Sequence, residues 1–440
     1  MCRKTGLHLI SFILFLSCVT PTFSQQYEGT GTPEWLQISL EHRTRYEHLT
    51  NPFRLNVSGT EKHFPLRTRL LLEVGEHNRP VRFLLEFQDS RVLYEKENLY
   101  STIANINNRD FLQAQLQFQS DRFPLKNLKS QLIVGRFTLN LGRRRLVARN
   151  NMRNTTNTFD GFSWTLTNSG HWTLQTFLTR PVIIDPYSLD SSSRRYFWGA
   201  NFESSQFQDY RTDVYYFGLH DVESSENRQR HATFGGRFYK MPALGEIDYE
   251  VESAVQFGEN GLEEHTAWLF HGEMGYRFNA SWQPRLSLHF DYASGDSDPG
   301  DRKSNRFHTL YGARGFEFSP TGIYGPFYRS NIHTPGIKIE LNPLKNLSIS
   351  TAYRAYRLAQ ARDTWVGSGL QDEAGNSGKS LGQNLDIRIW WKICRLITLE
   401  SGYALFVKGS YLDLVPDGPG MQNSNYFFIA TEFKAQLLPL

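Results

Sequence analysis

The chain has 440 residues, with 48 Lys and Arg residues against 44 Asp and Glu residues, and only 39% of its residues are hydrophobic. This composition excludes a bundle of transmembrane helices, and a formal net charge of +4 gives no reason to expect a nucleic-acid partner. Aromatic residues nevertheless make up 14% of the chain, and aromatic side chains favour β-strands.

Residues 1–24 have the pattern of a secretory signal peptide. The basic pair Arg3-Lys4 precedes an apolar run, and the small residues of Thr22-Phe23-Ser24 suit a cleavage site. A lipoprotein signal ending at Cys18 is the alternative, but bulky residues precede this cysteine where small ones belong. We therefore predict that residues 25–440 form the mature protein, as a single domain.

The mature chain alternates between apolar and polar residues in segments of about ten residues. In the first segment, Leu36, Ile38 and Leu40 alternate with polar residues. A period of two places the two sets on opposite faces of a β-strand, whereas a helix would mix them. The alternation predicts eighteen strands, near residues 35–47, 65–75, 80–90, 111–120, 130–139, 158–168, 171–180, 195–203, 211–220, 231–240, 246–257, 266–278, 284–293, 332–342, 346–358, 381–393, 397–406 and 425–434.

The connections between these strands alternate in length. The long polar ones are 48–64, 91–110, 140–157, 181–194, 221–230, 258–265, 294–331, 359–380 and 407–424. Barrels of the bacterial outer membrane have long extracellular loops and short periplasmic turns. We therefore predict an all-β fold, a single closed antiparallel transmembrane β-barrel of about 18 strands.

The apolar face of such a barrel contacts lipid, and the charged face lines the lumen. Arg43, Arg67 and Arg82 are therefore expected to point inward. In a soluble protein the charged face would form part of the core, and burying its unpaired ions would cost several kcal/mol each, whereas a hydrated lumen avoids this cost. A soluble β-propeller or solenoid is the main alternative, but the sequence has no repeat of about 40–50 residues. A barrel of this size leaves an aqueous channel.

Two connections carry local patterns. Asparagines recur in 140–157, which suggests a loop that folds on itself and bends into the lumen. Residues 296–301 are rich in oxygen ligands, but they lack the twelve-residue calcium pattern and are interpreted as an exposed turn.

Several motifs, in this order along the chain, carry a resemblance to a known family. They are Arg43-Thr44-Arg45-Tyr46-Glu47, Leu66-Arg67-Thr68-Arg69-Leu70, Glu86-Phe87-Gln88-Asp89-Ser90-Arg91, Val134-Gly135-Arg136, Arg153-Asn154-Thr155, Phe159-Asp160-Gly161 and Leu381-Gly382-Gln383-Asn384-Leu385-Asp386-Ile387. With these motifs the chain resembles the alginate export family, whose members are eighteen-stranded outer-membrane porins of Gram-negative bacteria.

The resemblance implies passive, charge-selective passage of an anionic polysaccharide or oligosaccharide through a lumen lined by arginine. The residues that match the family's basic and acidic lining are Arg67, Arg69, Arg136, Arg153, Arg388, Glu86, Asp160 and Asp386. Arginine suits this role because its planar fork binds a carboxylate bidentately and stays charged. Outer-membrane lipids are the other expected partner, and no cofactor or metal ion is expected.

Two alternatives to polysaccharide passage stay open, a general porin and a channel for small acidic solutes, because the predicted lining is not specific to a polysaccharide. Arg and Glu ladders also stiffen the wall of any large barrel, and Glu250 and Glu252 make the predicted lining mixed in charge. Asn384 stands where the family motif has an acidic residue. A general porin, or a channel for small acidic solutes, would show the same pattern.

An enzyme embedded in a barrel is the remaining alternative. Such an enzyme needs a nucleophile and a base, or a cluster of Asp and His residues, near one rim. The sequence contains no Gly-x-Ser-x-Gly and no His-Glu-x-x-His motif, and its 13 histidines are scattered. We therefore predict a channel rather than an enzyme, and a monomer.

Overall fold

The computed structural model describes residues 35–76, 79–93, 104–121, 128–205, 210–221, 228–315 and 317–438. The predicted signal peptide over 1–24 lies outside the described residues. Eighteen strands form the wall of a barrel: β1 (Leu36–Thr50), β2 (Thr60–Val74), β3 (Val81–Leu93), β4 (Asn107–Ser120), β5 (Lys129–Phe137), β6 (Phe159–Asn168), β7 (Trp172–Ile183), β9 (Arg195–Ser204), β10 (Arg211–Asp221), β11 (Gln229–Lys240), β12 (Ile247–Asn260), β13 (Glu263–Arg277), β14 (Arg285–Ala293), β16 (Ile332–Leu344), β17 (Leu347–Arg357), β18 (Ser380–Lys392), β19 (Ile397–Lys408) and β20 (Ser424–Leu438).

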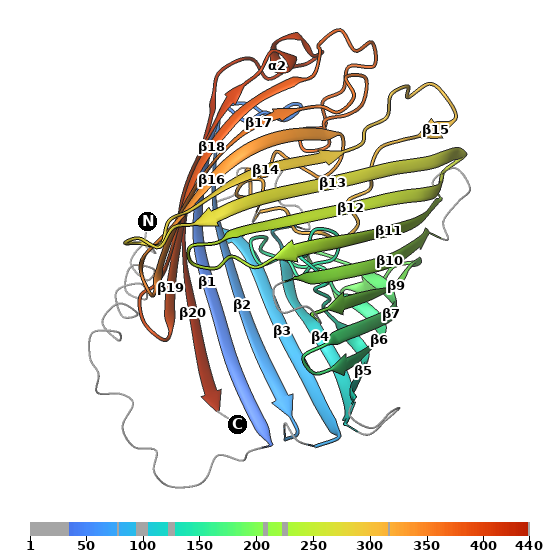
Figure 1. The fold of residues 1–440 in the computed structure, drawn as a ribbon, viewed down its shortest axis with the longest axis vertical. Helices are drawn as coiled ribbons and strands as arrows, with labels where there is room; N and C mark the ends of the chain where they lie inside the picture. Colours follow the sequence, from blue (N-terminus) through green and yellow to red (C-terminus); the bar gives the residue numbers. More distant parts are fainter. Residues whose placement is uncertain are drawn as a thin grey trace, which may run out of the picture.

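Each wall strand pairs antiparallel with the next, and β1 pairs with β20, so the sheet closes on itself (Figure 1). The prediction of eighteen strands in one closed barrel is confirmed, with every predicted strand overlapping an observed one. The two-residue strands β8 (Ser191–Ser192) and β15 (Lys303–Ser304) and the short helix α2 (Tyr411–Leu414) belong to the connections. Within the described residues, no helix is long and apolar enough to cross a membrane.

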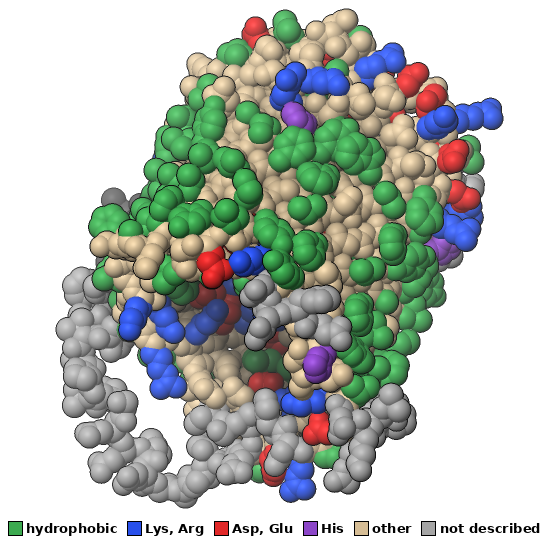
Figure 2. Space-filling model, viewed as in Figure 1, with side chains coloured by type: hydrophobic (Ala, Val, Ile, Leu, Met, Phe, Trp, Pro, Cys, Tyr) green, Lys and Arg blue, Asp and Glu red, His purple; other side chains and the backbone are tan. Residues whose placement is uncertain are grey.

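The two faces of the wall differ as the alternation predicts. The outward side chains of Leu70, Val251 and Ile387 are 41–43% exposed, which suits contact with lipid. The inward side chains of Arg43 and Arg67 are only 6% and 2% exposed. Figure 2 shows hydrophobic side chains gathered over the outer surface of the strands. The barrel therefore has an apolar exterior and a polar interior, as a closed transmembrane sheet requires.

Val251→Arg tests this assignment of faces. An arginine on the lipid face near the middle of the apolar layer should lower the free energy of unfolding by about 2–4 kcal/mol. Thr398→Arg introduces the same side chain into a cavity of the lumen and should cost much less. Urea titrations of both variants in lipid vesicles measure the difference, and an equal cost would contradict the assignment.

One predicted loop is wrong. The connection expected at 258–265 is a two-residue turn, because β12 continues to Asn260 and β13 begins at Glu263. Gly261 adopts a φ of +63°, which a tight turn requires, and its N–H donates to the carbonyl of Arg228 at 2.7 Å. The polar residues interpreted as a loop are instead paired in the ladder of a longer hairpin.

Three of the long connections fill part of the lumen. Inward side chains of the wall, such as Phe197 and Phe406, pack against residues of the connections 138–158, 294–331 and 358–379 to form a buried apolar core. Tyr311, for example, contacts Phe197 with ring centroids 4.9 Å apart. The prediction that the 140–157 segment bends inward is therefore confirmed, and the barrel is not an open tube.

Candidate functional site: a basic recess in the lumen

A cavity of about 710 Å³ lies in the lumen, between the wall and the connection 138–158. It is lined from β1, β2, β18, β19 and β20 and from the turn that joins β18 to β19. An adjoining cavity of about 890 Å³ shares six lining residues with it, including Glu41, Arg69 and Lys434. The two cavities together are called the basic recess here. Because Arg395 and Leu396 of a short turn line both, the basic recess lies at the end of the barrel where the short turns are.

Positive charge is concentrated in the cavity of about 710 Å³. Nine of its lining residues are basic and three are acidic, whereas the whole chain has 48 basic and 44 acidic residues. The basic ones are Arg43, Arg67, Arg69, Arg144, Arg149, Arg388, Lys392, Arg395 and Lys434, and the acidic ones are Glu41, Glu400 and Glu432. A positive excess of six charges in an enclosed space attracts anions and concentrates them.

Arg43 and Arg67 bind the connection that covers the recess. Arg43 donates to the carbonyl of Asn151 at 2.5 Å and to that of Arg153 at 3.0 Å, and Arg67 donates to both carbonyls at 3.2 Å. Arg67 also forms an ion pair with Glu41 at 2.5 Å. These two arginines therefore hold the 138–158 connection in the lumen.

Arg69, Arg149 and Glu86 form a second polar group on the same side. Arg149 binds the Glu86 carboxylate bidentately, at 2.6 and 2.9 Å, and Gln113 donates to it at 2.5 Å. The Nε of Arg69 donates to Gln88 at 2.8 Å, whereas its Nη2 has no hydrogen-bond acceptor among the described residues. Glu86 is thus already neutralised, as expected for an acidic residue that positions basic ones.

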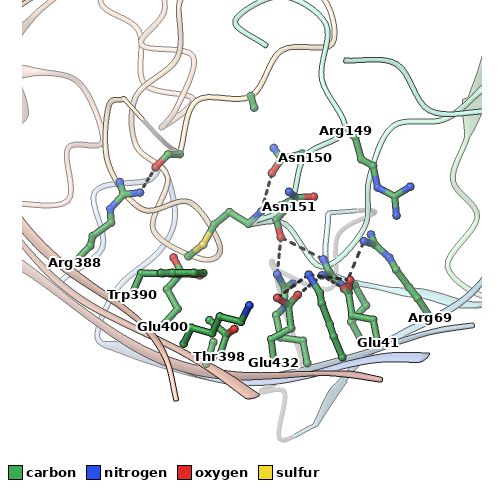
Figure 3. Close-up of a pocket in the computed structure, with 18 of the residues that line it drawn as sticks. Glu41, Arg69, Arg149, Asn150, Asn151, Arg388, Trp390, Thr398, Glu400 and Glu432 are labelled. Carbon is green, nitrogen blue, oxygen red and sulfur yellow. Dashed lines mark hydrogen bonds and ion pairs between the residues drawn. The ribbon is translucent and has the colours of Figure 1, made fainter. Parts of the chain in front are cut away.

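The opposite side of the recess carries basic residues with fewer partners. Arg388 donates to the carbonyl of Gly315, and its Nε lies 3.5 Å from an Asp386 oxygen. Lys392 and Arg395 are exposed to the cavity, and in the described part of the chain their side chains have no hydrogen-bond or ion-pair partner. Figure 3 shows Arg388 and Trp390 on one side of the cavity and Arg69 and Arg149 on the other. Lys392 and Arg395 are therefore free to bind an anion.

The remaining predicted site residues lie elsewhere. Arg136 and Asp160 pair with each other, with Nε–Oδ1 and Nη2–Oδ2 distances of 2.8 and 3.1 Å, and neither lines the basic recess. Arg153 contributes its carbonyl rather than its side chain to the covering of the recess. Asp386 is buried behind Arg388 and accepts a hydrogen bond from Asn384 at 3.2 Å. Of the eight predicted residues, the structure brings Arg67, Arg69, Arg388 and Glu86 to the recess.

Sequence reasoning missed several lining residues. Trp390 and Lys392 share the inward face of β18 with Arg388, two and four residues away, so the alternation of that strand could have identified them. Arg149 could not be identified in this way, because it lies in a connection without regular alternation.

Two acidic side chains of β12, Glu250 and Glu252, are neutralised by an arginine from a connection. The side chain of Arg145 is 0% exposed and forms ion pairs with Glu250, with Glu252 at 2.5 Å and with Glu317 at 2.5 Å. Burial would raise the pKa of Glu317, but Arg145 and Arg329 hold it well below its ordinary value. We call Arg145 and its three carboxylates the Arg145 cluster. It ties the connections 138–158 and 294–331 to the wall.

One group in the described residues has the spacing of metal ligands, His271, Asp291 and Glu317. Their carboxylates are already paired, because Asp291 binds Arg354 at 2.7 Å and Glu317 binds Arg145. We therefore assign this group to the ion pairs that hold the interior together.

Comparison with known proteins agrees with this architecture. The alginate export family profile matches residues 34–419. A search of curated proteins finds no match.

Solved structures share the fold at low identity. The chain is 13% identical to OccK11 (OpdR) of Pseudomonas aeruginosa, with a TM-score of 0.61 over 91% of this chain and 96% of that one. It is 11% identical to the outer membrane protein opdK of the same organism, with a TM-score of 0.61 and coverages of 92% and 100%. It is 12% identical to OccAB1 of Acinetobacter baumannii, with a TM-score of 0.63 and coverages of 94% and 100%. On the family match and the closed barrel, this chain belongs to the alginate export family and is an outer-membrane channel of bacteria.

Proposed function

We propose that the protein allows passive, charge-selective passage of an anionic polysaccharide or oligosaccharide, alginate-like in its carboxylated sugar rings. The observation that carries this proposal is the basic recess, where nine basic residues line one cavity with only three acidic ones inside a closed barrel. Membership of the alginate export family supports the same substrate class. The chemistry needs no covalent step, no metal ion and no cofactor.

Two features suit transport rather than tight binding. Fixed charges in a low-dielectric enclosure raise the local concentration of anions, and salt weakens the effect. Conduction also requires that each site be weak enough to release its ligand. Arg43, Arg67 and Arg149 are already bonded to the protein, which leaves few cations to hold any one carboxylate. The concentration gradient then sets the direction of passage.

The second candidate is a channel for small acidic solutes. The size of the recess favours it, because the cavity lined by nine basic residues has a volume of about 710 Å³, which accommodates a small acid. The connections that fill part of the lumen restrict larger molecules. Passage of a polysaccharide therefore requires the connections 138–158 and 294–331 to move out of its path, whereas passage of a small acid requires less movement of these connections.

Purified protein in planar lipid bilayers separates the two candidates. We expect an anion-selective current that hexuronate oligosaccharides block at lower concentration than citrate does. Stronger block by citrate would favour the small-solute channel, and a current with no preference for anions would contradict both. An enzyme would instead show turnover with little current. Chemical cross-linking of the purified protein in detergent tests the prediction of a monomer.

A further inference from the structure

Trp390 is an aromatic side chain in the charged lumen. It follows Arg388 by two residues on β18 and therefore shares its inward face, and it lines the 710 Å³ cavity of the basic recess. Its neighbour Trp391 lies on the opposite, outward face. Figure 3 shows the indole of Trp390 beside the cavity, near Glu400 and Arg388.

The indole of Trp390 has no partner in the protein. Its cross-strand neighbours are the polar residues Ser348 and Glu400, and among the described residues no aromatic ring packs on it and no side chain binds its N–H. The side chain is 46% exposed. Leaving a large apolar ring in water is unfavourable by about 25 cal/mol for each Å² of apolar surface, so a ligand that covers it gains free energy.

The cations around Trp390 define which ligand fits. Arg388 and Lys392 lie on the same strand face, one on each side of the indole, each at a spacing of about 6.6 Å along the strand. Arg395 follows in the adjacent turn and lines the same cavity. A hexuronate ring combines an apolar C–H face with a carboxylate at its edge, and this pairing matches an exposed indole flanked by cations. A small acyclic acid has the carboxylates but no such face.

We propose that Trp390 determines specificity for carboxylated sugar rings. The indole stacks on the C–H face of a hexuronate residue while Lys392 and Arg395 bind its carboxylate. This inference rests on the proposed function and adds to it a reason why the channel distinguishes saccharides from small acids of equal charge.

The test compares block of the single-channel current by a hexuronate trisaccharide and by citrate, which carry similar charge. Trp390→Ala should raise the blocking concentration of the trisaccharide about tenfold, since a lost stacking contact is worth about that much, and should leave that of citrate nearly unchanged. Trp390→Phe should recover most of the effect, because it keeps an aromatic face. Trp391→Ala is the matched control and should leave both values unchanged.

The outcomes separate this inference from the proposed function. If the trisaccharide does not block the wild-type channel, the proposed function fails. If it blocks the wild-type channel and Trp390→Ala with equal strength, or if Trp390→Ala weakens block by the trisaccharide and citrate alike, the role of Trp390 is overturned and the proposed function stands. The Trp390→Phe variant and the open-channel conductance show that each protein tested is folded.

Discussion

Arg145→Ala should both widen the lumen and lower the stability of the barrel. The substitution removes the cation shared by Glu250, Glu252 and Glu317. Glu250 keeps Arg237 and Glu317 keeps Arg329, but Glu252 loses its ion-pair partner among the described residues. Removing one partner of a buried ion pair typically costs about 3–5 kcal/mol, because an uncompensated charge stays buried. We therefore expect the free energy of unfolding to fall by about that amount. The connections 138–158 and 294–331 should also leave the wall, so that single-channel conductance rises.

Arg143→Ala is the control for this experiment. Arg143 lies two residues away in the same connection, but its side chain is 51% exposed and its nearest carboxylate oxygen, on Glu250, is 4.0 Å away. Exposed pairs of this kind contribute about 0–1 kcal/mol, so conductance and stability should remain close to the wild type. Wild-type conductance in Arg145→Ala would show that the Arg145 cluster does not hold the connections in place.

The double variant Lys392→Gln/Arg395→Gln should weaken anion selectivity without unfolding the protein. Both side chains are exposed to the basic recess and have no partner among the described residues, so their removal breaks no internal contact. We expect the blocking concentration of a hexuronate oligosaccharide to rise about fivefold, and the difference from the wild type to shrink as salt is added. Reversal potentials under a salt gradient measure the selectivity directly.

The matched control removes two positive charges from other short turns. Arg79 is exposed and pairs with Glu76, and Lys345 is exposed in the turn between β16 and β17, and neither lines the recess. Arg79→Gln/Lys345→Gln should therefore leave block and selectivity unchanged. An equal loss in both double variants would mean that net charge, rather than the recess, sets selectivity. Variants of Arg43 or Arg67 are less informative, because they also release the 138–158 connection.

The wall of the barrel was predictable from the sequence because one rule governs it. Every second side chain must face lipid, so the alternation marks each strand and its faces. The same rule failed at 258–265, where polar residues on both faces belong to a hairpin that extends past the apolar layer. The hydrogen bonds between β12 and β13 continue in this segment, although the alternation of apolar and polar residues ends before it.

The site was predictable only in part, because alternation gives a direction and not a position. Arg136 and Arg388 both point inward, but Arg136 pairs with Asp160 away from the basic recess. Whether Arg43 binds a ligand or a backbone carbonyl depends on the connection that folds against it, and that connection has no periodicity to read. The alternation of β18 places Trp390 on the inward face, but Trp390 stands in an apolar run with Ile389 and Trp391 and therefore does not stand out as a lining residue.

The seam between β1 and β20 has a consequence for biogenesis. It joins residues about 375 positions apart, such as Thr50 and Asn425, so the first strand finds its second neighbour only when nearly the whole chain has been delivered. Until then, both edges of the sheet carry unpaired amides that lipid cannot satisfy. A nascent chain shortened before Ser424 would keep those edges permanently, and we expect it to be degraded in the periplasm rather than inserted.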